Sequence, residues 1–235
     1  MSHVLNHQNT YLKIIAECSF ARPRVSNKQI IHFANVSPAT VTETTRILQK
    51  KGLVDRHRYT GVTLTAVGER LACRLLYNYR LCEVFLAEHL RLPLNAVPAQ
   101  AWAVAANLTP ETAIALNDYL DHPQQSPFGG TLDSTQMLDD TAITRLSDVP
   151  APTTITLDSY LETPGLVDYL QHLQLPLGVT LTVRKRDSAL NLIYLETAQQ
   201  REITVDLSAA DYIYTTPAET PVAKTLVTNQ ITSES

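Results

Sequence analysis

Glycine is scarce in this chain, with seven residues in 235, and tryptophan and methionine are scarcer still, with one and two. A phosphate-binding loop needs several glycines close together, so the chain offers little material for a nucleotide cradle. The motifs G-x-G-x-x-G, G-x-x-x-x-G-K-[ST], G-x-S-x-G and H-E-x-x-H do not occur in the sequence. Since these motifs mark several large enzyme classes, we expect no enzymatic activity.

Cysteine is also rare, and the three cysteines form no C-x-x-C pair. This argues against a disulfide framework and against a thiolate zinc site, and it fits a reducing compartment. No run of about 18 apolar residues is present, so no transmembrane helix is expected. The opening residues "MSHVLNHQNTY" lack the basic and apolar regions of a signal peptide. We therefore expect a cytoplasmic protein with no membrane partner.

The overall charge of −4 conceals an uneven distribution. Residues 1–75 hold 11 Lys and Arg against 4 Asp and Glu, a charge of +7, and residues 76–235 hold 8 against 19, a charge of −11. A basic first third on an acidic remainder indicates that the first third meets a polyanion, of which nucleic acid is the foremost candidate.

Residues 9–21 are predicted to form a first helix, because Tyr11, Ile14, Ile15 and Cys18 recur with helical spacing. The next two helices carry start signals. Ser26 opens one through the capping-box pattern S-x-x-Q.

Ser37 followed by Pro38 opens another helix, which ends at Gly52. Two short helices joined by a tight turn at Asn35 form the helix-turn-helix pattern of DNA-binding proteins. The stretch that follows, "LVDRHRYTGVTLT" (residues 53–65), alternates apolar and polar residues and predicts a β-hairpin, the wing of a winged helix.

The second helix of this motif and the wing carry the side chains suited to DNA. Hydroxyl groups can touch base edges, and arginine and lysine can meet phosphates. The predicted DNA-binding residues are Ser37, Ala39, Thr40, Thr42, Glu43, Arg46, Lys50, Arg56 and Arg58.

The stretch "VSPATVTETTRILQKKGLVDRHRYTGVTLTAVGERLA" resembles the winged helix of the DtxR/MntR metalloregulators, the iron- and manganese-responsive repressors. The resemblance continues through "YRLCEVFLAEHLRLPLNAV" and "HPQQSPFGG", and more weakly into residues 155–215. It implies a mixed α+β chain that regulates transcription by binding a palindromic double-stranded operator as a homodimer.

The resemblance also implies three domains, and the local patterns agree with them. Thr65 is expected to cap a long helix, and Thr109-Pro110-Glu111 to open another that ends at His122-Pro123. The runs "TITLD", "VTLTVRKRD", "LNLIYLE" and "REITVDL" predict strands, with a short helix at "PGLVDYLQHL". A winged helix-turn-helix is expected at residues 1–75 and a helical dimerisation and metal-sensing-type domain at 76–140. A linker at 141–153 would lead to a small SH3-like barrel of the FeoA type at 154–217, followed by a disordered tail at 218–235.

Family members hold Mn²⁺ or Fe²⁺ with side chains of the first helix and the second domain, and some add ligands from the third. At these positions only two carboxylates remain, Glu83 and Glu162. The other ligand positions are occupied by Gln8, Thr10, Tyr79, Pro98, Trp102, Ala105, Ala106 and Gly165. Because high affinity needs about six ordered ligands, we predict that metal dependence is reduced or lost, with apolar packing by Trp102 in place of the metal.

Alternatives remain open. Asp118 and His122 stand at helical i, i+4 spacing, which suits a relocated metal as well as a solvated helix end. The apolar residues around Trp102 could fill the space of the metal centre or line an effector pocket. A protein that does not bind DNA but pairs with an intact metalloregulator is the second functional hypothesis.

Overall fold

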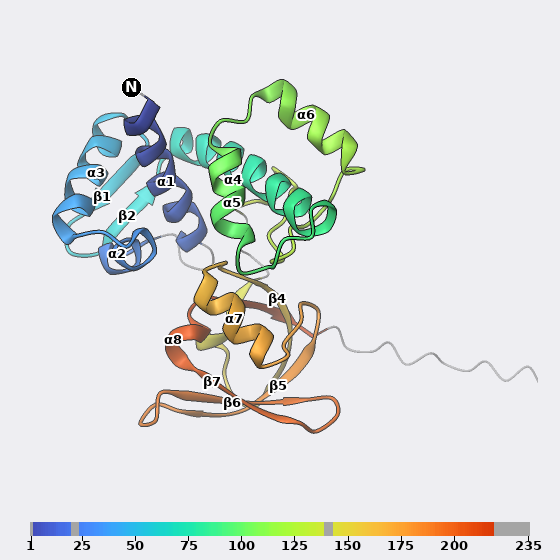
Figure 1. Cartoon of the computed structure of the whole chain (residues 1–235). Helices are drawn as coiled ribbons and strands as arrows, with labels where there is room; N and C mark the ends of the chain where they lie inside the picture. Colours follow the sequence, from blue (N-terminus) through green and yellow to red (C-terminus); the bar gives the residue numbers. More distant parts are fainter. Residues whose placement is uncertain (1, 20–23, 139–142, 219–235) are drawn as a thin grey trace, which may run out of the picture.

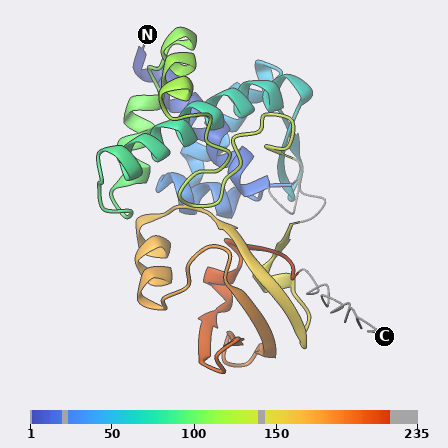
Figure 2. The same cartoon turned by 90° about the vertical axis from the view of Figure 1, so that its right-hand side faces the viewer.

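The structure is a computed structural model that describes residues 2–19, 24–138 and 143–218. A helical body is formed by the first two thirds of the chain, and a β-sheet domain lies below it in both views (Figures 1 and 2). The predicted mixed α+β architecture, a winged helix followed by a helical domain and a small SH3-like domain, is confirmed.

The winged helix consists of three helices and a hairpin. The elements are α1 (Ser2–Ser19), α2 (Asn27–Ala34), α3 (Pro38–Lys50), β1 (Val54–His57) and β2 (Gly61–Leu64). The hairpin strands pair antiparallel from Val54↔Leu64 to His57↔Gly61. The predicted helix-turn-helix and wing are therefore present. Helix α1 begins seven residues before the predicted start, because the stretch 2–8 contains neither proline nor glycine to prevent it.

Side-chain caps fix where these helices begin. Ser26 and Gln29 form the predicted capping box at the start of α2, and the Ser37 Oγ accepts from the Thr40 N–H at 3.2 Å at the start of α3. Between the two helices Asn35 adopts a left-handed conformation with φ of 49°. The tight turn sets α3 at an angle to α2, as helix-turn-helix motifs require.

The helical domain comprises α4 (Ala66–Val84), a π-helical turn (Phe85–His89), α5 (Val97–Ala105) and α6 (Pro110–Tyr119). Helix α4 runs without a break through the expected domain boundary at 75/76, so the winged helix and the helical domain share this helix. Gly68 allows α4 to approach the winged helix, because a Cβ there would lie 1.9 Å from the backbone oxygen of Leu53.

Helix α6 ends earlier than predicted. Its last residue is Tyr119, whereas the sequence pattern placed the end at His122. Asp121 and His122 both have positive φ, 56° and 55°. Since a residue before proline disfavours the α-helical region, Pro123 is the physical reason that the chain leaves the helix before it.

The C-terminal domain is built on one antiparallel sheet with the strand order β3-β8-β4-β5-β6-β7. The strands are β3 (Thr144–Arg145), β4 (Thr153–Tyr160), β5 (Thr180–Asp187), β6 (Leu192–Thr197), β7 (Glu202–Asp206) and β8 (Ile213–Pro217). Two helices, α7 (Pro164–His172) and α8 (Leu207–Ala210), accompany it. Four strands and α7 follow the predicted runs, whereas β3, β8 and α8 were not anticipated.

The segment expected to be a linker, 141–153, is structured where it is described. Thr144 and Arg145 pair with β8, and a 3₁₀ turn follows at Leu146–Asp148. The first residues of β4 also fall in it. The sequence pattern missed β3 because two residues are too few to show an alternation. The expected tail, 218–235, lies outside the described residues apart from Ala218.

Two large groups of buried side chains hold the molecule together. One fills the winged helix and reaches α4. The other joins the helical domain to the sheet, with Tyr79 and Phe128 beside Ile155 and Val183. Trp102 packs against both groups, so it connects all three parts of the chain. Among the described residues, no helix is both long and apolar enough to span a membrane.

Candidate functional site

Helix α3 has one buried and one exposed face. Val41, Thr44, Thr45 and Leu48 are buried against the winged-helix core. The exposed side chains include the predicted contacts Ser37, Ala39, Thr42, Glu43, Arg46 and Lys50, while Thr40 is half-buried. The helix thus presents a polar face of the right size for a major groove.

The exposed face of α3 carries an internal ion pair. Arg46 donates to both carboxylate oxygens of Glu43, at 2.7 and 3.0 Å, and this hydrogen bond lowers the pKa of Glu43. The pair holds the guanidinium against the helix surface. To reach a phosphate, Arg46 would have to leave Glu43. An exposed ion pair contributes little free energy, so breaking this one costs little.

The wing adds arginines and an aromatic residue. Arg56 and Arg58 are exposed, as predicted. Sequence reasoning missed Tyr59, which is 91% exposed at the hairpin tip with φ of 64°. The Arg58 guanidinium lies 4.9 Å from the centre of the Tyr59 ring.

The positions of the family's metal ligands lie where α1 meets the helical domain. Trp102 Nε1 donates to Thr10 Oγ1 at 3.0 Å, so these two positions are joined directly. Gln8 is nearly buried and accepts a hydrogen bond from Lys51. The rings of Tyr79 and Trp102 meet edge to face with centres 5.9 Å apart.

Four further ligand positions, Pro98, Ala105, Ala106 and Gly165, carry no polar side chain. Pro98 and Ala105 are buried and Ala106 caps the end of α5, while Gly165 is exposed at the start of α7. Glu83 is fully buried on α4, and Glu162 is half-buried in the C-terminal domain. The structure joins Thr10 and Tyr79 to Trp102 directly, whereas Gly165 lines a different cavity.

A lysine that sequence reasoning missed occupies the middle of this region. The Lys13 ammonium lies 3.7 Å from the centre of the Tyr79 ring and 5.6 Å from that of Trp102. It forms an ion pair with Glu17 Oε1 at 2.6 Å, one turn further along α1, and both side chains are nearly buried. The predicted apolar plug is thus accompanied by a buried positive charge held on two aromatic faces.

Carboxyl groups surround the Lys13 ammonium. Burial lowers the pKa of Lys13, but the negative charges of Glu17, Glu162 and Glu83 outweigh burial, and the net effect raises it. For Glu83, burial and the charge of Glu162 raise the pKa well above its usual range. The raised pKa of Lys13 keeps its ammonium charged.

The residues present do not fit a divalent metal ion. Among the described residues, no three His, Cys, Asp or Glu side chains converge as possible ligands. The buried Lys13 ammonium would repel a divalent metal ion bound by the same carboxyl groups. The alternative pair Asp118 and His122 is exposed, with 3.8 Å between Oδ1 and Nε2, and His122 also contacts Asn117 at 2.6 Å. That arrangement is a solvated helix end.

Comparisons with known proteins agree with this geometry. Residues 4–62 match the family model "Iron dependent repressor, N-terminal DNA binding domain", and residues 65–132 match "Iron dependent repressor, metal binding and dimerisation domain". The chain belongs to the DtxR/MntR family of metal-dependent transcriptional repressors. Members of this family are transcriptional regulators and not enzymes, so the sequence-based expectation is confirmed.

Named relatives of this family cover different parts of the chain. The iron-dependent repressor IdeR of Mycobacterium tuberculosis is 26% identical over 163 residues, 64% of this chain and 69% of its own. The regulator MntR of Lysinibacillus sphaericus is 36% identical over 81 residues, 34% of this chain and 55% of its own. The structure of the manganese regulator SloR matches with a TM-score of 0.78 and 28% identity, covering 90% of this chain and 98% of that one.

Proposed function

We propose that this protein is a DNA-binding transcriptional repressor that binds a palindromic operator as a homodimer. The exposed face of α3 would enter the major groove, and the wing would follow the backbone. The support is the polar face of α3, with Thr42, Arg46 and Lys50 exposed, together with Arg56 and Arg58 on the wing. The basic first third of the chain adds the attraction that binding to phosphates needs.

The homodimer is supported by apolar side chains on the surface of the helical domain. Between the end of α4 and the end of α6, four large apolar residues are about half or more exposed: Leu90 55%, Val104 49%, Ile114 64% and Tyr119 63%. We infer that these residues form part of a contact with a second copy of the chain. A two-fold dimer formed by this surface would place two α3 helices on neighbouring half-sites of one operator.

We further propose that Lys13 replaces the metal ion and that operator binding needs little or no metal. In the family, a metal ion orders the first helix against the sensing domain. The observation that carries this proposal is the Lys13 ammonium, buried on the Tyr79 ring and paired with Glu17. A covalently attached cation holds α1 on α4 at all times, so the DNA-binding arrangement would be permanent.

The test starts from the purified protein and a pool of random double-stranded DNA. Sequences selected in the presence of a chelator would be read out and then measured in chelator and in added Mn²⁺. We expect a palindromic consensus and affinities that agree within about twofold. Elemental analysis of the same preparation should find less than one equivalent of metal per chain.

Three other outcomes would overturn parts of this proposal. Binding that vanishes in chelator and returns with Mn²⁺ would refute the replacement of the metal by Lys13. Failure to select any sequence, with or without metal, would refute operator binding by the homodimer. In that case a pull-down that recovers an intact metalloregulator would support the heterodimer hypothesis instead.

A further inference from the structure

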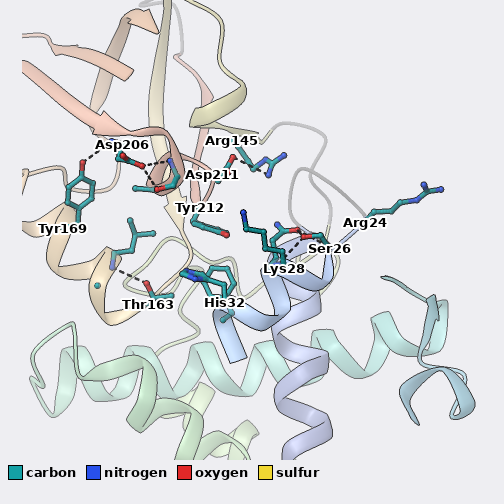
Figure 3. Close-up of a pocket in the computed structure, with 16 residues that line it drawn as sticks. Arg24, Ser26, Lys28, His32, Arg145, Thr163, Tyr169, Asp206, Asp211 and Tyr212 are labelled. Carbon is teal, nitrogen blue, oxygen red and sulfur yellow. Dashed lines mark hydrogen bonds and ion pairs between the residues drawn. The ribbon is translucent and has the colours of Figure 1, made fainter. Parts of the chain in front are cut away.

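A large cavity lies between the winged helix and the C-terminal domain, apart from the Lys13 cluster. Its volume is about 910 Å³, which is within the range of small-molecule sites. Figure 3 shows Arg24, Lys28 and His32 on the side of the winged helix and Arg145, Tyr169 and Tyr212 on the side of the sheet domain. Of the metal-ligand positions, only Gly165 lines it.

The acidic side chains of this cavity already have partners. The Asp206 carboxylate accepts from the Ser208 N–H at 2.7 Å, and it caps α8. Asp211 accepts from the Ser147 hydroxyl at 2.7 Å. Both carboxylates are held by these neutral donors and keep their negative charge, so an incoming anion has to approach the cationic side of the cavity.

The cationic side chains are less well satisfied. Arg145 is only 5% exposed; its Nε donates to Asp148 at 3.2 Å, and its Nη1 lies 3.8 Å from Asp211. Its Nη2 is buried without a hydrogen-bond partner among the described residues. A buried donor without a hydrogen bond is unfavourable, so an anion that accepts from it would be stabilised there. Lys28, across the cavity, is exposed.

Aromatic rings on the wall of the cavity form a platform. The Tyr212 ring lies parallel to that of His32, with centres 6.0 Å apart and an angle of 11°. Phe33 meets Tyr212 edge to face at 4.7 Å. Burial raises the pKa of Tyr212 to about 12, so its hydroxyl stays protonated and can donate a hydrogen bond. The cavity thus combines positive charge, a donor and flat apolar surfaces.

We propose that this cavity binds a small organic anion composed of a planar ring and a carboxylate. The carboxylate would lie between Lys28 and the Arg145 guanidinium, where charge-assisted hydrogen bonds are strong. The ring would pack on the His32–Tyr212 platform. Because the two walls belong to the winged helix and to the C-terminal domain, such a ligand would favour the arrangement in which they adjoin.

Calorimetry on the full chain, without DNA, tests this proposal independently of operator binding. The probes are indole-3-carboxylate, its neutral amide and inorganic phosphate. We expect the carboxylate to bind at least about tenfold more tightly than either of the others. If the amide bound as tightly as the carboxylate, recognition of the negative charge would be refuted. If phosphate bound as tightly, a contribution of the planar ring to binding would be refuted. No heat from the carboxylate at about 10 mM would refute the site.

A matched pair of variants locates the binding. Lys28→Glu reverses one exposed charge at the cavity, and it should weaken carboxylate binding by about tenfold or more. Lys185→Glu makes the same change on β5, outside the cavity, and should leave the affinity within about twofold. Since both lysines are exposed, both variants should fold, which thermal melting would verify. Equal effects of the two variants would overturn the assignment of the site.

Discussion

Replacing Lys13 by methionine removes the buried charge and keeps nearly all of the side chain's length. In the wild-type protein the ammonium pairs with Glu17 at 2.6 Å and lies 3.7 Å from the centre of the Tyr79 ring. Both charged side chains are about one tenth exposed or less. The substitution leaves the buried Glu17 carboxyl without its counter-ion, and because burial already raises the pKa of Glu17 to about 7, this carboxyl would have to take up a proton in the variant.

The expected cost can be worked out from these contacts. Breaking one half of a buried ion pair destabilises a protein by about 3–5 kcal/mol. Loss of the cation–π contact adds about 1 kcal/mol, and the apolar methionine recovers part of both. A net loss of about 3 kcal/mol is a large share of a total stability of about 5–15 kcal/mol. The double variant Lys13→Met with Glu17→Gln removes both charges, and it should recover most of the stability that Lys13→Met loses.

Urea denaturation followed by circular dichroism measures this loss. Lys185→Met is the matched control, because Lys185 is 65% exposed in its ion pair with Asp187, and its loss should cost less than about 0.5 kcal/mol. The reasoning would be refuted if Lys13→Met cost no more than this control. It would also be refuted if the double variant were less stable than Lys13→Met alone, since Glu17 would then need no counter-ion.

Three further predictions concern the other parts of the molecule. Arg56→Ala, on the wing, should reduce the slope of log affinity against log salt by about one per subunit, whatever the DNA sequence, in binding titrations at several salt concentrations. Ile114→Asp should convert the dimer to a monomer in light scattering, whereas Leu190→Asp, equally exposed on the sheet domain, should not. Gly68→Ala should cost about 3 kcal/mol in thermal or urea unfolding, because its Cβ would lie 1.9 Å from the Leu53 oxygen; an unchanged stability would show that α4 can shift freely.

Much of the fold could be predicted from local patterns. Ser26 with Gln29, Ser37 with Pro38, and Thr65 each mark a helix start in the sequence, and each forms the expected cap. Strands with alternating apolar residues were equally visible. Short or edge elements were not, because β3 consists of two residues whose pairing with β8 depends on the tertiary structure alone.

The candidate site was predictable only in part. The ligand positions were located through the family resemblance, and the structure places Thr10 and Tyr79 in contact with Trp102. Lys13 gave no signal, since a lysine one turn before a glutamate on a helix usually marks a solvated face. Its burial depends on what α4 and α5 place over it, which no local pattern contains. The same holds for the cavity lined by Arg145, whose walls are far apart in the sequence.

The proposed replacement of the metal ion by Lys13 has a consequence for regulation. A metal ion leaves when its concentration falls, whereas the Lys13 ammonium is attached to α1 and cannot dissociate. If a lysine holds α1 in place, the fold keeps the DNA-binding arrangement and loses the response to metal. A regulator built in this way needs its signal to enter elsewhere, at a place that still connects the winged helix to the rest of the chain. The cavity lined by Lys28 and Tyr212 meets that requirement, because a ligand bound in it would contact both the winged helix and the C-terminal domain.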